Sequence, residues 1–343
     1  MNLVVKTRIN SFTKFFFKFR RPITREALSD FLYSLILSLL TVWIQVVKLP
    51  GSLAYVANDQ QFRHLSVLEG TAGSPWAYRV TSEYVLKMID SLLGFFGFSF
   101  TTSAITFRVL QNLLIFILLS IFISRFLSKG LSRIAMMIFA YVTFNSNWNS
   151  DLSFNVYSDI LFALVFAILI SDRKFWLCYP LLILAITNRE TSLYLVLFMF
   201  AYIPKPRSRD FGHALGLMLV GLTTVLIVRS LIGFRAYMVY ECCSVPFGYL
   251  QRNFEQQSLF FFSQSFLAVL AYLVISWTKV PRQFQRGLLL CIPWLVIHWS
   301  MTFVEETRLF LVPFTVIALP ALLGTLMPQE THSNSKVLKR TES

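Results

Sequence analysis

A polar stretch at residues 58–79 carries side chains that could do chemistry in an otherwise apolar chain. It contains Asp59, Arg63, His64, Glu69 and Arg79. Side chains of the same types recur later in the chain, at Arg189, Glu190, Glu305, Glu306 and Arg308. A carboxylate can take a proton from a hydroxyl, and a guanidinium can bind phosphate through two parallel donors. The sequence therefore offers a candidate general base and candidate ligands for an anionic group.

Asp59 is the candidate catalytic residue. With a sugar–phosphate donor, an inverting displacement needs only a general base from the side chains, provided that the leaving phosphate is neutralised. Arg308, Arg189 and Arg79 are the candidate donor-phosphate ligands. Four other carboxylates compete with Asp59 for the role of base, namely Asp151, Asp159, Glu305 and Glu306. The alternative for Asp59 is a solvated loop residue.

A metal site has weaker support in the sequence. Asp59, His64 and His298 could meet near one face, but no HxxxH, HExxH or paired-carboxylate motif fixes them. No GxSxG motif, glycine-rich phosphate loop or CxxC pair occurs either. We assign no metal ligand and leave a divalent metal ion open as a cofactor.

The composition is that of a membrane protein. Hydrophobic residues make up 56% of the 343 residues and charged residues 14%, against about 45–50% and about 25% in soluble domains. Apolar runs that approach a hydrocarbon core of ~30 Å lie at 31–47, 104–124, 134–148, 156–171, 175–187, 191–203, 213–231, 258–277, 287–303 and 309–327. We therefore predict an all-α polytopic transmembrane helix bundle with about ten spans, some of them short.

Basic residues indicate the orientation of these spans. They collect in the first thirty residues, in every second loop and in the tail, near Arg25, Arg125, Arg173, Arg207, Arg282 and Arg340. Lys and Arg favour the cytoplasmic side, so both termini are expected there. This gives a cytoplasmic basic arm (1–30), a single transmembrane domain (31–327) with a long first outer loop (48–103), and a cytoplasmic polar tail (328–343).

The net charge of +14 does not indicate nucleic-acid binding. Most of the excess lies in the segments assigned to the cytoplasm, where membrane topology and anionic lipids already account for it. The expected partners are membrane lipids.

Polar residues gather near the outer ends of the predicted spans and form a polar rim. Its supporting members are Asp159, Glu190, Glu305, Glu306, His64 and His298. Arg108 and Arg229 lie at the same level, and for these two we expect the simpler role of anchors whose long side chains reach the membrane surface.

Two local patterns place residues at this rim. Residues 175–203 lie between basic segments, and two arms of about 13 residues reach only ~20 Å. The apex at 188–191 is therefore expected below the outer surface, unless the segment is one long tilted helix. In the first outer loop, VTSEYVLKMIDSLL places Tyr84 and Met88 opposite Glu83 and Lys87, which predicts an amphipathic helix lying in the membrane plane.

Four short motifs carry a resemblance to a known family. They are NDQQF (58–62), SPWAYRV (74–80), TNRET (187–191) and EETRLF (305–310). With the long first outer loop and the short paired helices, the chain resembles the GT-C class of membrane glycosyltransferases, such as protein O-mannosyltransferases, aminoarabinose transferases and bacterial relatives. The resemblance implies a polyprenyl-phosphate sugar donor, Asp59 as the catalytic acid of the first loop, Arg308 as a donor-phosphate ligand and a bacterial inner membrane.

The chain also departs from this family. Many members carry two adjacent acidic residues in the first loop, where this chain has Asn58 and Asp59, and larger members add a soluble C-terminal domain. Two other classes of function stay open: a transporter or flippase of lipid-linked glycans, and a polysaccharide polymerase or noncatalytic membrane subunit. Transporters usually place ionisable groups near the bilayer midplane between repeats, and we find no repeat in this sequence.

Overall fold

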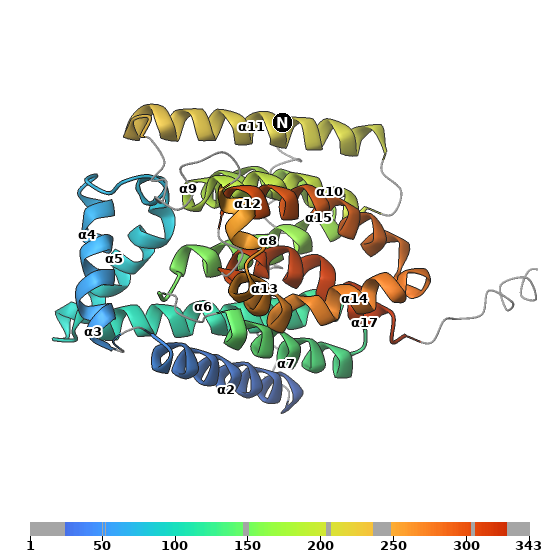
Figure 1. Ribbon diagram of the computed structural model, residues 1–343, viewed down its shortest axis with the longest axis horizontal. Helices are drawn as coiled ribbons and strands as arrows, with labels where there is room; N and C mark the ends of the chain where they lie inside the picture. The colour runs from blue at the N-terminus through green and yellow to red at the C-terminus, as the bar shows by residue number, and fades with distance from the viewer. Residues whose placement is uncertain are drawn as a thin grey trace, which may run out of the picture.

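The computed structural model describes residues 25–49, 51, 53–146, 151–203, 207–235, 248–302 and 306–327, and within them it contains helices and no β-strand. The first half holds α2 (Arg25–Val47), α3 (Leu53–Tyr55), η2 (Val56–Gln60), α4 (Gln61–Leu68), η3 (Trp76–Tyr78), α5 (Val80–Phe95), α6 (Phe100–Ile123), α7 (Lys129–Ser146) and α8 (Phe154–Ser171) (Figure 1). The second half holds α9 (Phe175–Asn188), η4 (Glu190–Tyr194), α10 (Leu195–Tyr202), α11 (Ser208–Ile232), α12 (Gly248–Asn253), α13 (Gln256–Phe262), η6 (Ser263–Leu267), α14 (Ala268–Ile275), η7 (Trp277–Lys279), α15 (Arg282–Met301), η8 (Thr307–Phe310), α16 (Leu311–Pro313), η9 (Phe314–Ala318) and α17 (Leu319–Gly324).

Each of the ten predicted apolar runs overlaps a helical segment, but the described helices differ in length and apolarity. Six are long and apolar enough to cross a membrane: Arg25–Val47, Phe100–Ile123, Phe154–Ser171, Ser208–Ile232, Gln256–Ile275 and Thr307–Gly324. The all-helical class is confirmed, and the six helices indicate a membrane-embedded, multi-pass protein. A total of ten spans stays a prediction.

Helix α2 shows that the surroundings of the bundle are apolar. Its buried residues are mostly polar, namely Ser34, Ser38, Thr41, Val42 and Gln45. Its outward side chains are large and apolar, including Ile36, Leu39, Leu40 and Trp43, with Ile36 62% and Trp43 68% exposed. Water would favour the opposite arrangement, because burial of apolar surface drives folding in water. Lipid chains are the solvent that suits this face.

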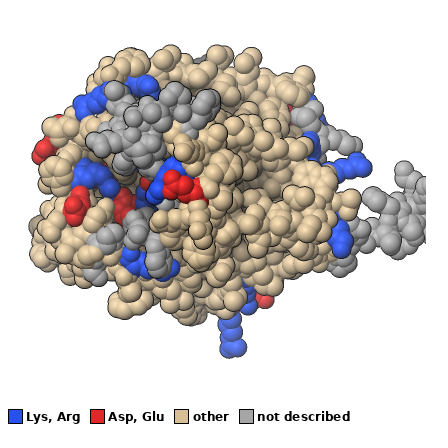
Figure 2. Space-filling model, viewed as in Figure 1, with Lys and Arg blue, Asp and Glu red and all other residues tan. Residues whose placement is uncertain are grey.

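The helices pack around α8, whose first turns are almost completely buried. Helix α6 packs against α2 and α8, and α9 packs against α8 and α11. In Figure 1, α2 and α11 border the bundle on opposite sides, and α4 and α5 lie together at one end. Figure 2 shows acidic and basic side chains gathered at that end and toward the middle of the view, with further basic side chains at the other end.

Residues 175–202 form a short hairpin that packs on α11. At the open end of the hairpin, Phe175 stacks on His213 at 4.8 Å and Phe200 contacts Phe211 at 5.3 Å, measured between ring centroids. The start of the first arm, α9, and the end of the second arm, α10, therefore both lie beside the beginning of α11. The chain reverses at Arg189, whose backbone is extended. The alternative of one long helix is wrong.

Helix α5 covers the segment for which the sequence predicts an amphipathic helix, but one part of the pattern is wrong. Glu83 is buried and pairs with His64, so it does not face solvent beside Lys87. Tyr84, Met88 and Leu92 are exposed, by 52%, 73% and 63%. This apolar exposed face fits contact with lipid, and the position of α5 in the membrane plane stays a prediction.

The expectation of membrane anchors is wrong for Arg108 and Arg229. Arg108 is fully buried, donates to Gln45 at 3.0 Å and to Asn112 at 2.6 Å, and lies over the ring of Tyr157. Arg229 forms two hydrogen bonds of 2.7 Å with the carboxylate of Glu190. Both arginines therefore hold helices together instead of reaching toward the membrane surface.

Candidate functional site

Asp151 lies between two arginines that come from distant parts of the chain. Its Oδ2 is 2.5 Å from Nη2 of Arg63 in α4, and its Oδ1 is 2.8 Å from Nη1 of Arg308 in η8. Burial alone would raise the pKa of Asp151, but the charges of Arg63 and Arg308 hold it well below its usual range. This carboxylate is therefore ionised at neutral pH, and each of its oxygens is paired with an arginine.

The backbone before α8 shapes this contact. Ser153 has a left-handed conformation with φ of 51°, which is uncommon for a residue other than glycine. Its hydroxyl lies against the carboxylate of Asp151 and receives a hydrogen bond of 2.5 Å from Nη1 of Arg308. Such strained positions concentrate at functional sites.

A second ion pair lies at the apex of the hairpin. Nη1 of Arg189 is 3.5 Å from Oδ2 of Asp159 in α8, and both residues are buried. Asn188 donates to Oδ1 of Asp159 at 2.7 Å, and Ser192 lies 3.2 Å from the same oxygen. The apex thus lies against protein, where α8 supplies its partner.

Arg79 and Arg63 share one aromatic surface. Their guanidinium carbons lie 4.4 Å and 4.3 Å from the ring centroid of Trp76, within the range of cation–π contacts. Arg79 also lies within electrostatic reach of Arg189, Glu306, Arg308 and Asp159. Burial, and then the charge of Arg189, lower the pKa of Arg79 to about 9, so Arg79 is still a cation at neutral pH.

These residues form one arginine cluster, which we define as Arg63, Arg79, Arg189 and Arg308 with Asp151, Asp159 and Glu306. Glu306 belongs to it because its Oε2 is 3.2 Å from Nη2 of Arg308. Four guanidinium groups face three carboxylates, so the cluster carries one positive charge in excess. A partly buried cationic site of this kind suits a phosphate or pyrophosphate group. All three predicted phosphate ligands, Arg79, Arg189 and Arg308, lie in it.

Several buried polar atoms at the arginine cluster have no hydrogen-bond partner. They are Nε of Arg308, Nδ2 of Asn155 and Oδ1 of Asn188. A buried polar group without a partner costs about 1–3 kcal/mol, so unpartnered groups are rare in folded proteins. These three atoms offer two donors and one acceptor for a polar ligand.

Asp59 lies at the edge of the arginine cluster. It belongs to η2, its side chain is exposed, and among the described residues it has no hydrogen-bond or ion-pair partner. Tyr55 lies within electrostatic reach of both Asp59 and the cluster. Burial and the charge of Asp151 raise the pKa of Tyr55, and the charge of Asp59 also raises it. The carboxylate of Asp59 is therefore available, and its catalytic role stays a prediction.

The two histidines of the predicted rim lie in separate surroundings. Nδ1 of His64 is 2.6 Å from Oε2 of Glu83, so that it joins α4 to α5. His298 stacks on Trp294 with a centroid distance of 4.5 Å, and its Nδ1 lies 2.9 Å from the carbonyl oxygen of Trp294. Within the part of the chain that the structure describes, no three His, Cys, Asp or Glu side chains are grouped to hold a metal ion.

The remaining acidic residues of the predicted rim have different positions. Glu190 pairs with Arg229 beside the arginine cluster, whereas Glu305 lies outside the described residues. The sequence did not identify Arg63 or Trp76 as site residues, or Asp151 as the common partner of Arg63 and Arg308. All three lie in segments assigned to the outer side. Their contacts join α4, η3, η8 and the loop before α8, and the spacing of these segments in the sequence does not show that they meet.

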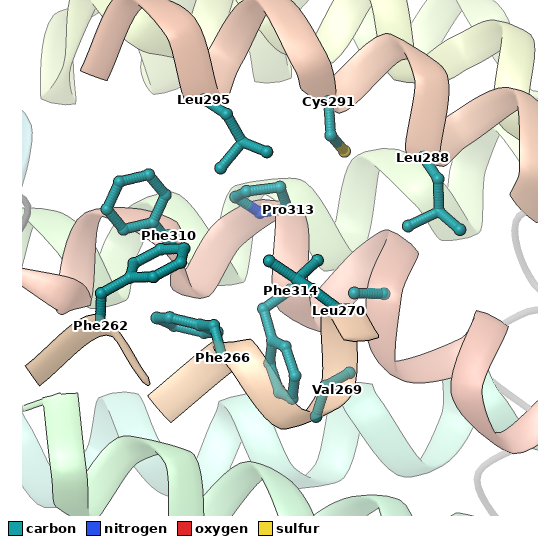
Figure 3. A pocket seen from close by; sticks show the side chains of 11 residues that line it. Phe262, Phe266, Val269, Leu270, Leu288, Cys291, Leu295, Phe310, Pro313 and Phe314 are labelled. Atoms are coloured by element: carbon teal, nitrogen blue, oxygen red, sulfur yellow. The ribbon is translucent and has the colours of Figure 1, made fainter. Parts of the chain in front are cut away.

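An apolar hollow lies beside η8, the segment that carries Arg308 of the arginine cluster. Its empty space is about 430 Å³, including a part that is open to the outside. It is lined by Phe262, Phe266, Val269, Leu270, Leu288, Cys291, Leu295, Phe310, Pro313, Phe314 and Ala318 (Figure 3). Phe310 follows Arg308 by two residues, and its ring lies 5.9 Å from that of His298. We call this space the phenylalanine groove. It offers an apolar chain a place beside a cationic site.

Comparisons of the chain with protein-family models, with curated proteins and with solved structures find no match in any of the three.

Proposed function

We propose that this protein is a membrane glycosyltransferase of the GT-C type, which moves a sugar from a polyprenyl-phosphate donor to an acceptor at the outer membrane face. The observation that carries the proposal is the arginine cluster, in which four guanidinium groups from three distant parts of the chain lie beside an apolar hollow. A lipid with an anionic phosphate head and a long hydrocarbon chain has the chemistry that matches both parts.

In the proposed reaction, the phosphate of the donor binds to Arg308, Arg189 and Arg79. The acceptor hydroxyl attacks the anomeric carbon and gives its proton to a carboxylate, while the bond between the anomeric carbon and the phosphate oxygen breaks. The electron pair of that bond stays on the leaving polyprenyl phosphate, where the guanidinium groups stabilise the added charge. Such a displacement inverts the anomeric configuration.

The contacts of the carboxylates favour Asp59 as the base. Asp151 binds Arg63 and Arg308, whose positive charges oppose its protonation, and Glu306 is already paired with Arg308. Asp59 is exposed and has no ion pair among the described residues. Asp159 is the second candidate, because it is buried at the cluster and its ion pair with Arg189, at 3.5 Å, is longer than the pairs of Asp151.

The phenylalanine groove is the proposed site for the chain of the donor. Its lining is apolar, and Phe310 brings one end of the groove close to Arg308. An isoprenoid chain reaches the groove from lipid and not from water, so its gain comes from van der Waals contact with the aromatic walls. The groove and the arginine cluster thus form two parts of one proposed donor site.

Binding of a polyprenyl phosphate to the purified protein in lipid nanodiscs tests the donor site. We expect Arg308→Gln and Arg189→Gln to weaken binding about tenfold each, since a charge-assisted hydrogen bond contributes about 1.5–3 kcal/mol. Arg125→Gln is the matched control, because Arg125 pairs with Asp172 away from the cluster. If the native protein and the three variants bind polyprenyl phosphate with equal affinity, the proposed phosphate site is refuted.

A transfer assay tests the base. Asp59→Asn is expected to abolish sugar transfer while polyprenyl-phosphate binding and the melting temperature stay unchanged, and Asp159→Asn provides the comparison. Full activity in Asp59→Asn with loss in Asp159→Asn would assign the base to Asp159. If the lipid exchanges between the leaflets of proteoliposomes and no sugar is transferred, the protein is a flippase; if it binds lipid and does neither, it is a polymerase or noncatalytic subunit.

A further inference from the structure

A second apolar groove lies on the surface of the bundle, apart from the phenylalanine groove. It lies between α5, α6 and α8, and its empty space is about 630 Å³, including a part that is open to the outside. Its lining residues are Thr81, Val85, Ile89, Phe107, Leu110, Gln111, Leu114, Ser158, Leu161 and Phe162. None of them lines the phenylalanine groove. We call this second space the α5 groove.

The α5 groove lies beside segments that supply the arginine cluster, although no residue of the cluster lines it. Ser158 in its wall directly precedes Asp159, and Thr81 follows Arg79 by two residues. The hydroxyl of Thr81 lies 2.7 Å from that of Thr187, which precedes Arg189 by two residues. The wall of the groove is thus continuous with the segments that supply Arg79, Asp159 and Arg189.

The outer side of the α5 groove opens toward lipid. Val85, Leu110 and Leu114 line it and are exposed by 40%, 43% and 50%. Leu110 and Leu114 lie on α6, one of the helices long and apolar enough to cross a membrane. A hydrocarbon chain can therefore enter this groove sideways from the bilayer, which an aqueous glycan or a protein loop cannot do at this depth.

Gln111 adds a polar feature to the wall. It is 1% exposed, and its Nε2 donates to the carbonyl of Phe154 and to the hydroxyl of Ser158, both at 2.8 Å. Its Oε1 is buried and has no donor. A carbonyl oxygen in this position can accept a hydrogen bond from a hydroxyl, but it offers nothing to a phosphate oxygen.

We infer that the acceptor of the proposed transfer is itself a membrane lipid with a free hydroxyl, held with its chain in the α5 groove. This inference rests on the proposed function and narrows its acceptor from lipid, glycan or protein to lipid. Two apolar grooves without shared residues lie beside segments that supply one charged cluster, so two lipids can present their heads to each other there. The sugar leaves the phosphate of one lipid and forms a glycosidic bond to the hydroxyl oxygen of the other, whose proton passes to the base.

Photocrosslinking in nanodiscs tests the acceptor groove. The probe is a diacylglycerol with a diazirine in one acyl chain and a free hydroxyl, and its acetylated form is the chemical control. We expect labelling within residues 80–114, at least fivefold weaker with the acetylated probe. Leu114→Trp fills the groove and should reduce labelling at least fivefold, whereas Leu222→Trp, at a residue of α11 that is 46% exposed, should not.

The same variants separate this inference from the proposed function. Leu114→Trp should leave the affinity for a polyprenyl phosphate within twofold of the native value. Unchanged probe labelling in Leu114→Trp would overturn the acceptor groove. The donor site would still stand if Arg308→Gln weakens polyprenyl-phosphate binding. A large loss of polyprenyl-phosphate binding in Leu114→Trp would instead assign the α5 groove to the donor and overturn the inference.

Discussion

Arg308 donates a hydrogen bond of 2.8 Å to Asp151, a residue 157 positions earlier in the chain. The other oxygen of the same carboxylate forms an ion pair with Arg63. Asp151 therefore connects the first outer loop, the start of α8 and the start of the last helical segment. The positions of the proposed phosphate ligands depend on this one carboxylate.

Loss of this carboxylate should destabilise the protein. Asp151→Asn leaves two largely buried guanidinium groups without their common partner, and breaking a buried ion pair typically costs about 3–5 kcal/mol. We expect a fall of several degrees in the melting temperature of the detergent-solubilised protein. Asp172→Asn is the control, since its pair with Arg125 is more exposed and such pairs contribute about 0–1 kcal/mol. A similar small change in both variants would contradict the role of Asp151.

The contribution of Asp151 should depend on pH in one direction. Arg63 and Arg308 hold its pKa in the folded protein well below the ordinary value of 3.8. Because the folded pKa is the lower one, the stabilisation is complete above the unfolded pKa and is lost as the pH falls below it. The melting-temperature difference between native protein and Asp151→Asn should stay constant from pH 8 to pH 5 and shrink below about pH 4. A difference that shrinks near pH 6 would place the titration on another group.

The sequence predicted that Arg79, Arg189 and Arg308 lie at one level, but it did not predict most of their partners. Apolar runs and basic loops indicated where the helices lie and that Arg79, Arg189 and Arg308 are near the outer ends of the spans. Both are local properties of the sequence, because membrane thickness limits the length of each span and charge limits its orientation. The pairing of Arg63 with Asp151, and of Glu83 with His64, depends on how separate segments pack. Arg108 shows the same limit: near the end of a span it resembles a membrane anchor, and only the positions of Gln45, Asn112 and Tyr157 determine that it faces inward.

Trp76 should contribute to phosphate binding without touching the phosphate. Its ring lies against both Arg63 and Arg79, and cation–π contacts of this kind contribute about 0.5–2 kcal/mol. Trp76→Leu should therefore weaken polyprenyl-phosphate binding about fivefold. Trp176→Leu, at a residue of α9 that is 70% exposed, should leave the affinity unchanged. Equal affinities in the two variants would show that the indole does not position these arginines.

The proposed orientation predicts which cysteine substitutions an impermeant reagent can reach. Lys87 in α5 and Lys129 in α7 are both exposed, and they lie in segments assigned to opposite sides of the membrane. In a background of Cys242→Ser and Cys243→Ser, a maleimide that cannot cross membranes should label Lys87→Cys in intact spheroplasts and Lys129→Cys only after lysis. Cys178 and Cys291 are buried and should not interfere. The reverse order of labelling would invert the topology and remove the outer-face reaction.

Arg235 should control the mobility of the loop that carries Trp76 and Arg79. Its guanidinium donates to the carbonyl oxygens of Gly70 and Ala72, and its backbone N–H donates to the hydroxyl of Tyr78 at 2.8 Å. These contacts join the end of α11 to residues 70–78. Arg235→Gln removes the charged donors and should increase amide hydrogen exchange at residues 72 and 77–79 about tenfold, since hydrogen bonds to charged groups contribute about 1.5–3 kcal/mol.

The exchange pattern should also distinguish a local effect from a general one. Arg252→Gln is the control, because Arg252 pairs with the neighbouring Glu255 in the α12 region. We expect no change in residues 72–79 for this variant, and no change in α6 or α8 for either variant. If exchange in Arg235→Gln rises equally throughout the bundle, Arg235 supports the whole fold. If exchange rises only in residues 70–79, α11 holds this loop over the arginine cluster, and polyprenyl-phosphate affinity should fall in the same variant.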